Sequence, residues 1–360
     1  MKERWTCEQA NEWYAKIGWM RGCNFIGSDC SNRLDMWQSY KCEEKLANAE
    51  RELELCQKIG FNTVRLWANF DVYHAEPDSF MEILDRYVAL CDKYGQKIMM
   101  VLAYEEDLPR GDVFVPKKLG EQPYAPASHQ NRVEMTPEQK ALQPKHYMEY
   151  PELRPIFLEM VQKIVRKYAK DERIFCWNIY NEPGIEIGDR SMELLKVLFA
   201  TVRAEDPVQP LCADVWRSVK NGKIATPEEE LALELSDVIS FHSYQSYEKL
   251  VAEIRLLQKY NRPLFQTEWL HRINHNNVQE VYPLLYLANV SNYCWGFVVG
   301  KTQTHEPWPG MWEQWDRGED RGYDFTKWQH DLFRPNLRPY DPREIALIEK
   351  FNRLATEEGR

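Results

Sequence analysis

Short apolar runs alternate with longer amphipathic stretches along the whole chain. The apolar runs have the length of β-strands and are rich in aromatic and β-branched residues. They lie at 21–27, 62–67, 97–104, 174–180, 209–216, 238–244, 263–269 and 293–299. The stretches between them place apolar residues three or four positions apart, which is typical of amphipathic helices. This spacing predicts helices at 46–59, 80–94, 153–168, 192–202, 228–235, 250–257, 278–289 and 345–354.

The regular alternation of strands and helices indicates a parallel sheet whose crossovers are helical. With eight strands and eight helices, we expect a (β/α)8 barrel and not a doubly wound open sheet. The sequence contains no internal repeat and no low-complexity segment that would mark a boundary. We therefore expect residues 1–360 to form a single barrel domain.

Two long segments interrupt this rhythm, at about 105–150 and 300–341. The first contains prolines at 109, 116, 123, 126, 137 and 144, and the second is dense in Trp and Pro. They follow the third and eighth predicted strands, so both should lie at the carboxyl end of the barrel. Functional sites of such barrels are built there, and long loops commonly form their walls.

Composition excludes some classes of function. A formal net charge of −10 argues against nucleic-acid binding, which needs a concentrated basic surface. No apolar run approaches the length of a membrane span, and the first residues are charged, unlike a signal peptide. The nine cysteines are scattered and odd in number, which is typical of reduced thiols in a core. We therefore expect a cytoplasmic protein without membrane or nucleic-acid partners.

Two glutamates occupy equivalent positions at the ends of buried strands. Glu182 follows the run 174–180 within Asn-Glu-Pro-Gly, and Glu268 ends the run 263–269. Strands four and seven of an eight-stranded barrel face each other, so both carboxylates should meet at its mouth. A facing carboxylate pair is the arrangement that cleaves glycosidic bonds, one group serving as acid and the other supporting the anomeric carbon.

The sequence also resembles a known family at these positions. The resemblance covers about residues 20–300, and four features carry it: Trp-x-x-x-Asn-Glu-Pro at 177–183, His242-x-Tyr244, Glu268 at a strand end, and Trp295 on strand eight. Together they resemble clan A glycoside hydrolases, with the cellulase-like family 5 as the nearest relative. The resemblance implies a retaining enzyme that acts on β-linked sugars without a cofactor or metal ion.

The resemblance further implies a role for each matching residue. Glu182 would be the acid/base and Glu268 the nucleophile. Asn181 would hydrogen-bond the substrate 2-hydroxyl, and Arg65 would keep the nucleophile ionised. The remaining matches would complete the site: His242 beside the carboxylates, Tyr244 orienting Glu268, and Trp295 forming the floor under the sugar at the −1 site.

Segments near both ends resemble uncharacterised bacterial cellulase-like proteins that are loosely labelled 1,4-β-xylanases. They are Gly-Cys-Asn-Phe-Ile with Leu-Asp-Met-Trp-Gln at 22–38, and Trp-Gln-His-Asp with Pro-Tyr-Asp-Pro at 328–342. One feature departs from family 5. The family usually has a histidine at the end of strand three, where this chain has Tyr104-Glu105-Glu106.

Several further residues are candidates for sugar contacts, because aromatic rings stack on the flat faces of sugars. Trp67 and Trp216 lie at strand ends, Trp37 lies beyond one, and each could equally be core. Asn24 on strand one could reach the site or merely pack. We expect Trp308, with Trp312 and Trp315, to form a lid or wall, and Trp177 to lie in the core. His271 and His275 are four residues apart but lack a supporting ligand cluster, so we expect no metal site there.

The leading interpretation is a retaining β-glycosidase that is exo-acting or acts on short oligosaccharides. It predicts a carboxylate separation of about 5–5.5 Å. Three alternatives remain: an endo-acting glucanase, mannanase or xylanase, a metal-dependent barrel hydrolase or isomerase, and a non-catalytic sugar-binding barrel. The sequence leaves open the sugar at the −1 site, the linkage and the oligomeric state.

Overall fold

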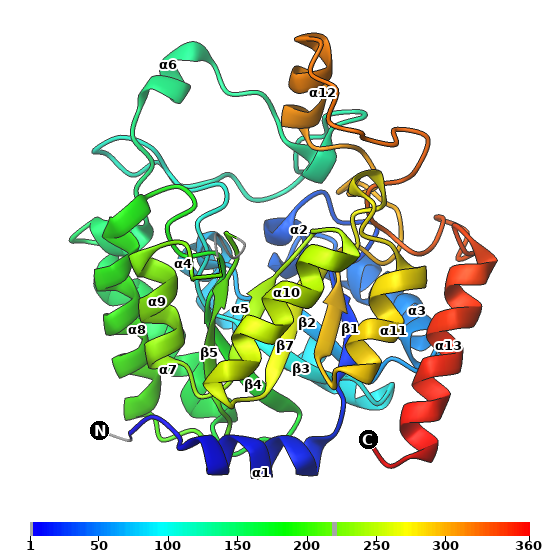
Figure 1. Ribbon diagram of the computed structural model, residues 1–360. Coiled ribbons are helices and arrows are strands. Elements are labelled where there is room, and N and C mark those ends of the chain that lie inside the picture. The colour runs from blue at the N-terminus through cyan, green and yellow to red at the C-terminus, as the bar shows by residue number, and fades with distance from the viewer. Residues whose placement is uncertain (1–2, 218–221) are drawn as a thin grey trace.

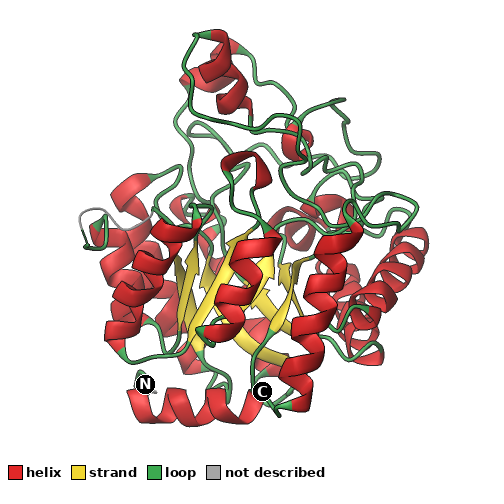
Figure 2. Cartoon of the chain, turned by 45° about the vertical axis from the view of Figure 1, so that its right-hand side comes forward, coloured by secondary structure: helices red, strands yellow, loops and turns green. Residues whose placement is uncertain are grey.

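The computed structural model describes residues 3–217 and 222–360, which form a closed barrel of parallel strands surrounded by helices (Figures 1 and 2). The strands follow one another around the barrel in sequence order, and β8 pairs with β1 to close it. Their bounds are β1 Arg21–Asn24, β2 Thr63–Trp67, β3 Lys97–Val101, β4 Ile174–Tyr180, β5 Leu211–Val215, β6 Ile239–His242, β7 Leu264–Trp269 and β8 Ser291–Cys294. The predicted (β/α)8 fold is confirmed.

The helices around the barrel include all eight that the sequence pattern predicts. These are α3 Cys42–Lys58, α5 Pro77–Lys93, α7 Arg154–Tyr168, α8 Ser191–Ala204, α9 Pro227–Leu235, α10 Tyr247–Leu257, α11 Val278–Leu287 and α13 Pro342–Glu357. Among the described residues, further α-helices are α1 Cys7–Ile17, α2 Arg33–Trp37, α4 Phe70–Ala75, α6 Pro137–Ala141 and α12 Pro309–Asp316. Short 3₁₀ turns lie at His129–Asn131, Tyr147–Glu149, Gly188–Arg190, Gln258–Tyr260 and Arg272–Asn274.

Some strand boundaries differ from those predicted. The eighth strand was expected at 293–299 but ends at Cys294, because Gly296 turns the chain with a φ of 74°. The third strand was expected to reach residue 104 and ends at Val101. In both places the apolar run continues past the sheet, because the residues beyond the strand are still buried under the loops.

Helix α1 closes the amino end of the barrel, below the strands in Figure 1. It begins with a capping box at Thr6 and Gln9, in which each side chain accepts from the other residue's backbone N–H. Its aromatic residues pack upward, and Trp13 stacks on Phe175 with ring centroids 6.1 Å apart. Because this end is filled by apolar side chains, a polar site can form only at the other end.

The interior of the barrel changes character along its axis. Buried apolar side chains fill the part nearest α1: Met99, Cys176, Cys212, Phe265 and Tyr293. Towards the carboxyl ends of the strands the buried side chains become polar, with Arg65, Asn178 and Asp214 fully buried. Buried polar groups need partners, so this layer supports the groups at the mouth.

The segments 105–150 and 300–341 both lie over the carboxyl end of the barrel, at the top of Figure 1, where they carry α6 and α12. This is the position that the sequence analysis predicted for them. Within residues 3–217 and 222–360, no helix combines the length and apolar character of a membrane span.

Candidate active site

Glu182 lies just beyond the end of β4, in a turn that Glu105, which follows β3, holds in place through hydrogen bonds. Its φ is 45°, a left-handed conformation that costs a non-glycine residue about 1–2 kcal/mol. Glu105 stabilises this turn. Its Oε1 accepts hydrogen bonds from the Gly184 N–H at 2.8 Å and the Tyr180 hydroxyl at 3.0 Å. Its Oε2 accepts from the backbone N–H groups of residues 186 and 187.

Glu268 lies near the end of β7 and is 6% exposed. The pairing of β6 with β7 shifts register at Phe241/His242, which brings His242 directly opposite Glu268. Two donors hold the carboxylate from different sides. Arg65 Nη1 donates to Oε1 at 3.0 Å, and the Tyr244 hydroxyl donates to Oε2 at 2.8 Å. Burial raises the pKa of Tyr244 well above its ordinary value, so its hydroxyl remains a donor.

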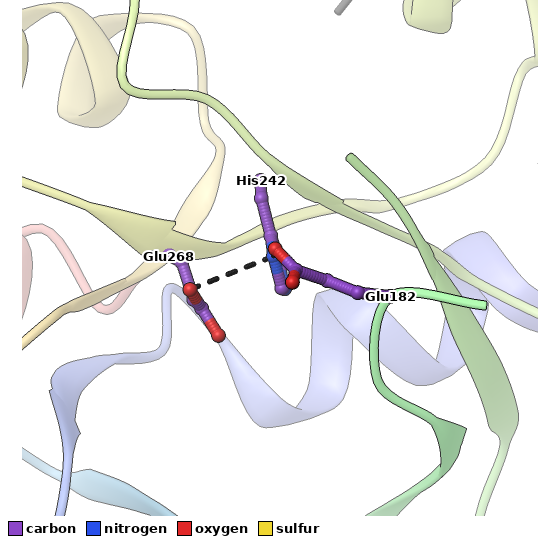
Figure 3. A group of neighbouring side chains, drawn as sticks. All are labelled: Glu182, His242 and Glu268. Atoms are coloured by element: carbon purple, nitrogen blue, oxygen red, sulfur yellow. Dashed lines mark hydrogen bonds and ion pairs between the residues drawn. The ribbon is translucent and has the colours of Figure 1, made fainter. Parts of the chain in front are cut away.

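His242 stands between the two glutamates (Figure 3). Its Nδ1 lies 2.7 Å from Glu182 Oε1 and 3.6 Å from Glu268 Oε2. One oxygen of each carboxylate and one ring nitrogen lie within 4.8 Å of one another. The two carboxylates therefore face each other at close range, with His242 between them.

Arg65 on β2 is fully buried under the cavity, where it hydrogen-bonds several polar side chains. Besides Glu268, it donates through Nη2 to Asp214 Oδ2 at 2.8 Å and to Asn181 Oδ1 at 2.7 Å. Its Nη1 also donates to Asn24 Oδ1 at 3.0 Å. With a longer contact to Asn178 Oδ1 at 3.4 Å, the guanidinium fixes the positions of two carboxylates and three amides at once.

The electrostatics of this group are dominated by burial and by neighbouring charges. Burial lowers the pKa of His242, but the charges of Glu268 and Asp214 outweigh it and raise the pKa to about 10. Burial raises the pKa of Glu268, and Glu182 adds to the rise, while His242 and Arg65 oppose it. Despite its burial, Asp214 has a pKa below the ordinary value because Arg65 and His242 face it. His242 is therefore a cation at neutral pH.

A cavity of about 430 Å³ lies above these groups. Its lining combines strand ends with the two long loops: Glu106, Gln130, Arg132, Glu182, Ile185, Trp216, His242, Tyr244, Gln245, Glu268, Asn274, Trp295, Trp308, Pro309 and Gly310. The volume lies towards the small end of ligand sites, which span roughly 300–1,000 Å³. The cavity suits a short ligand.

The two loops are joined to each other beside the cavity. The Gln303 side chain accepts from the Ala127 N–H at 2.6 Å and donates to the Ala125 carbonyl at 2.7 Å. His129 Nδ1 lies 2.6 Å from the Glu306 carbonyl, and its Nε2 accepts from Trp308 Nε1 at 3.0 Å. These contacts fix Trp308 as part of the wall.

The structure shows which of the candidate tryptophans line the cavity and which do not. Trp295, Trp308 and Trp216 line the cavity. Trp312 and Trp315 do not. They lie on α12, 44% and 60% exposed, so the predicted lid or wall includes only the first member of that cluster. Trp177 is fully buried, as predicted for a core residue.

Three expected sugar contacts lie beneath the cavity instead. Trp37 is fully buried against Phe80 and Tyr87, and its Nε1 donates to a backbone carbonyl at 2.7 Å, which corrects its prediction as a stacking platform. Trp67 is 1% exposed and packs edge-on against Trp295, with ring centroids 5.3 Å apart. Asn24 is 4% exposed and holds Arg65, so its contact is with the protein.

Asn181 and Arg65 are also fully buried and do not line the cavity. His271 packs on the Trp308 ring at 4.5 Å, whereas His275 Nε2 lies 2.9 Å from the Gly322 carbonyl. Burial lowers the pKa of His271 to about 3, which keeps it neutral. The two histidines therefore serve different contacts and form no ligand pair.

Sequence reasoning missed Asp214, Glu105 and Glu106 as parts of the site. Asp214 stands in an otherwise apolar strand, and a carboxylate in such a run is a signal of a functional site. Glu105 and Glu106 appeared only as a departure from family 5. The loop residues of the lining, such as Gln130 and Arg132, carry no sequence signal.

Glu182, His242 and Glu268 offer three atoms that could ligate a divalent cation. The surroundings do not favour one. Both oxygens of Glu268 already accept hydrogen bonds, from Arg65 and Tyr244. His242 Nδ1 already lies 2.7 Å from Glu182 Oε1, at hydrogen-bond distance. The arrangement favours acid–base chemistry.

No protein-family profile matches the sequence, and no curated protein is similar to it in sequence. Solved structures are similar in fold. An endo-β-1,4-mannanase from Thermotoga petrophila matches with a TM-score of 0.59 and 14% identity, over 97% of this chain and 79% of that one. A GH5_18 protein from Streptomyces cattleya, solved with Manβ1-4GlcNAc, matches with a TM-score of 0.61 and 12% identity, over 94% and 81%.

A glycoside hydrolase family 5 mannosidase from Rhizomucor miehei matches with a TM-score of 0.56 and 13% identity, over 94% of both chains. Identities this low establish the fold alone. The chain therefore has the barrel fold of these family 5 structures, as its sequence motifs predicted.

Proposed function

We propose that this protein is a retaining β-glycosidase that hydrolyses glycosides or short β-linked oligosaccharides by double displacement. The observation that carries the proposal is the close pair of carboxylates, Glu182 and Glu268, at facing strand ends with His242 between them. Retaining hydrolysis requires such a pair, and a sugar-binding barrel without activity does not.

In the first step Glu268 attacks the anomeric carbon, and the bond to the leaving oxygen breaks. Glu182 gives its proton to that oxygen, so the aglycone leaves as an alcohol. Arg65 and Tyr244 hold Glu268 with both oxygens bound, which fixes the direction of attack. His242 Nδ1, 2.7 Å from Glu182, keeps the acid beside the leaving group.

In the second step a water molecule enters where the aglycone was. Glu182 takes a proton from it while its oxygen attacks the anomeric carbon, and the ester bond to Glu268 breaks. The sugar leaves with its original configuration, because two inversions cancel. Both glutamates return to their starting protonation states.

The walls that the two long loops form beside the cavity support action on chain ends or short substrates. The loops 105–150 and 300–341 contribute Gln130, Arg132 and Trp308 to its wall, and Gln303 joins them. An endo-acting cleft would instead reduce the viscosity of a soluble polysaccharide quickly with few new reducing ends, and that result would replace the exo assignment.

We also propose that the whole chain is one catalytic unit that acts in the cytoplasm. All nine cysteines are free thiols, although Cys176 and Cys212 have sulfur atoms 3.7 Å apart. Buried pairs this close remain reduced most readily in a reducing compartment. Its substrates would then be small imported sugars.

A screen of aryl β-glycosides tests the proposal: mannoside first, because the structural neighbours include mannosidases, then glucoside, xyloside, galactoside and fucoside. The responding sugar is then used with variants. Glu182→Ala should lose roughly 10²–10⁴-fold with poor leaving groups but much less with good ones. Azide should restore its second step and give a glycosyl azide of unchanged configuration.

Glu268→Ala should be inactive on every substrate, and any azide product should have inverted configuration. Glu186→Ala is the matched control, because this glutamate lies on the same loop as Glu182 but pairs with Arg110 outside the cavity. It should keep wild-type activity. Dialysis against a chelator should leave the activity intact, and its loss would favour the metal-dependent alternative.

A further inference from the structure

Arg132 is a cation in the cavity wall that the double-displacement mechanism does not use. The residue is exposed, and its Nη2 donates a hydrogen bond to Gln130 Oε1 at 3.0 Å. Within residues 3–217 and 222–360 it forms no ion pair. The guanidinium therefore keeps N–H donors for a ligand.

Every carboxylate among the described lining residues already faces a cation. The pairs are Glu268 with Arg65 at 3.0 Å, Glu182 with His242 at 2.7 Å and Glu106 with Arg33 at 3.4 Å. Among these lining residues, Arg132 therefore carries a positive charge that no carboxylate balances. Arginines on an open surface are commonly surrounded by water alone, but a lone cation in a cavity wall attracts anionic ligands.

The turn that leads to Arg132 is strained and is held from several sides. Three of its residues have a left-handed backbone, with φ of 54° at Ala127, 55° at Gln130 and 51° at Asn131. Residues other than glycine disfavour this conformation. The Ser128 hydroxyl donates to the Arg132 carbonyl at 3.0 Å, and the contacts of Gln303 and His129 tie the turn to the segment 300–341. Strain that so many contacts maintain is typical of segments that hold a ligand.

Gln130 provides a second donor beside the guanidinium, and both residues line the cavity. Its amide oxygen accepts from Arg132, so its NH₂ group remains for other contacts. This NH₂ group donates to no residue that the structure describes. A guanidinium with an amide NH₂ beside it can donate to two oxygens of one anion, which a carboxylate or a phosphate supplies.

We propose that Arg132, together with Gln130, forms a subsite that binds an anionic group on the leaving part of the substrate. This inference rests on the proposed hydrolysis. In that reaction the −1 sugar lies against Glu268 at a strand end, whereas Arg132 belongs to the loop segment above the strand ends. When a chain end occupies the −1 site, the unit beyond it is the leaving unit. The substrate class is therefore a β-linked glycoside whose leaving unit carries a carboxylate, as a uronic acid does, or a phosphate ester.

Disaccharides that share the −1 sugar test this subsite. The sugar that responds in the aryl glycoside screen is joined to glucose, to glucuronic acid or to glucose 6-phosphate, through the linkage that the wild-type protein cleaves best. In the wild type, kcat/KM should be roughly 10- to 100-fold higher for an anionic disaccharide than for the neutral one, as for hydrogen bonds between charged groups. The uronic acid and the phosphate are tested separately, and the faster of the two identifies the anion.

Arg132→Met removes the charge from a side chain of similar reach. The preference for the anionic disaccharide should then fall below about 3-fold, because the partner of the anion is gone. A merely structural role of Arg132 would instead lower kcat/KM for the neutral and anionic disaccharides by the same factor. Arg132→Lys keeps the charge without the planar fork, so it should keep only part of the preference. Added salt should weaken the wild-type preference, because an exposed cation is screened.

Arg110→Met is the matched control, because Arg110 lies in the same loop and pairs with Glu186 outside the cavity. It should keep the wild-type preference. A wild type that prefers neither anion, or an equal loss of preference in both Met variants, would overturn the proposal. A wild-type protein that hydrolyses no glycoside would overturn the proposed function instead. Calorimetry then tests the subsite by itself, since the wild type should still bind an anionic disaccharide roughly 10-fold more tightly than the neutral one, and Arg132→Met should not. Thermal unfolding of each variant verifies that it is folded.

Discussion

Replacing Arg65 by Met should lower the stability of the protein and disfavour the ionised form of Glu268, the proposed nucleophile. Arg65 is fully buried and forms ion pairs with Asp214 at 2.8 Å and Glu268 at 3.0 Å. Methionine fills a similar space but leaves both carboxylates buried without this cation. Removing one partner of a buried ion pair costs about 3–5 kcal/mol. We therefore expect the free energy of unfolding at pH 7 to fall by that amount.

The loss of stability should depend on pH with a definite sign. The pKa of Asp214 is lowered in the folded protein, so its ionised form stabilises the fold above its unfolded pKa, about 3.9. That stabilisation disappears as pH falls through the lower, folded pKa. The difference between wild type and Arg65→Met should be complete at pH 6–7 and shrink below about pH 4.

The pH dependence of kcat/KM measures the effect of the substitution on the ionisation of Glu268, independently of stability. Arg65 lowers the pKa of Glu268 against the effect of burial, so its removal should raise that pKa further. Two unit charges about 4 Å apart interact by about 4 kcal/mol at an effective dielectric constant of about 20, which describes buried sites as well. Even a third of this moves a pKa by about one unit. The acid limb of the kcat/KM profile should therefore move at least about one unit to higher pH.

Urea unfolding at several pH values and a pH–rate profile measure these effects. Arg272→Met is the matched control, because Arg272 and Glu344 form another buried pair that does not line the cavity. It should lose comparable stability without moving the acid limb. An Arg65→Met protein with the wild-type acid limb, or with unchanged stability at pH 7, would refute the reasoning.

Three further changes have expected outcomes. Tyr244→Phe removes the hydroxyl that lowers the pKa of Glu268, so kcat should fall roughly 10- to 100-fold and the acid limb should move to higher pH in a pH–rate profile. Glu105→Gln cannot accept from all the donors of the β4 turn, and urea unfolding should show a loss of about 1–3 kcal/mol. Gln303→Ala removes part of the contact between the two loops, so limited proteolysis within 105–150 should accelerate and KM should rise, with kcat on an aryl glycoside nearly unchanged.

The barrel could be predicted because its strands are buried along their whole length and therefore form unbroken apolar runs. Helices α3 and α5 showed a clear apolar face, and Gly60 and Gly95 follow them with positive φ. The short helices α2 and α4 have only a turn or two, too little for periodicity to register. Their positions depend on tertiary packing.

The carboxylate pair of Glu182 and Glu268 could be predicted because position in the chain alone brings the ends of strands four and seven together. The aromatic residues could not be sorted in this way. Trp37 and Trp308 both lie in polar surroundings in the sequence, yet one is packed in the core and the other lines the cavity. Glu105 and Glu106 are adjacent and have opposite environments, one closing a turn and the other facing the cavity. Only the path of the loop decides between them.

The charges under the cavity suit the proposed reaction, in which the sugar becomes positive. Three carboxylates, Glu182, Glu268 and Asp214, face two cations, Arg65 and His242. With the acid proton on Glu182 the group is neutral, which its burial favours. When that proton leaves, the group becomes negative as the sugar becomes oxocarbenium-like and positive. In the proposed reaction each charge therefore appears opposite its counter-charge, in a site already fixed by hydrogen bonds.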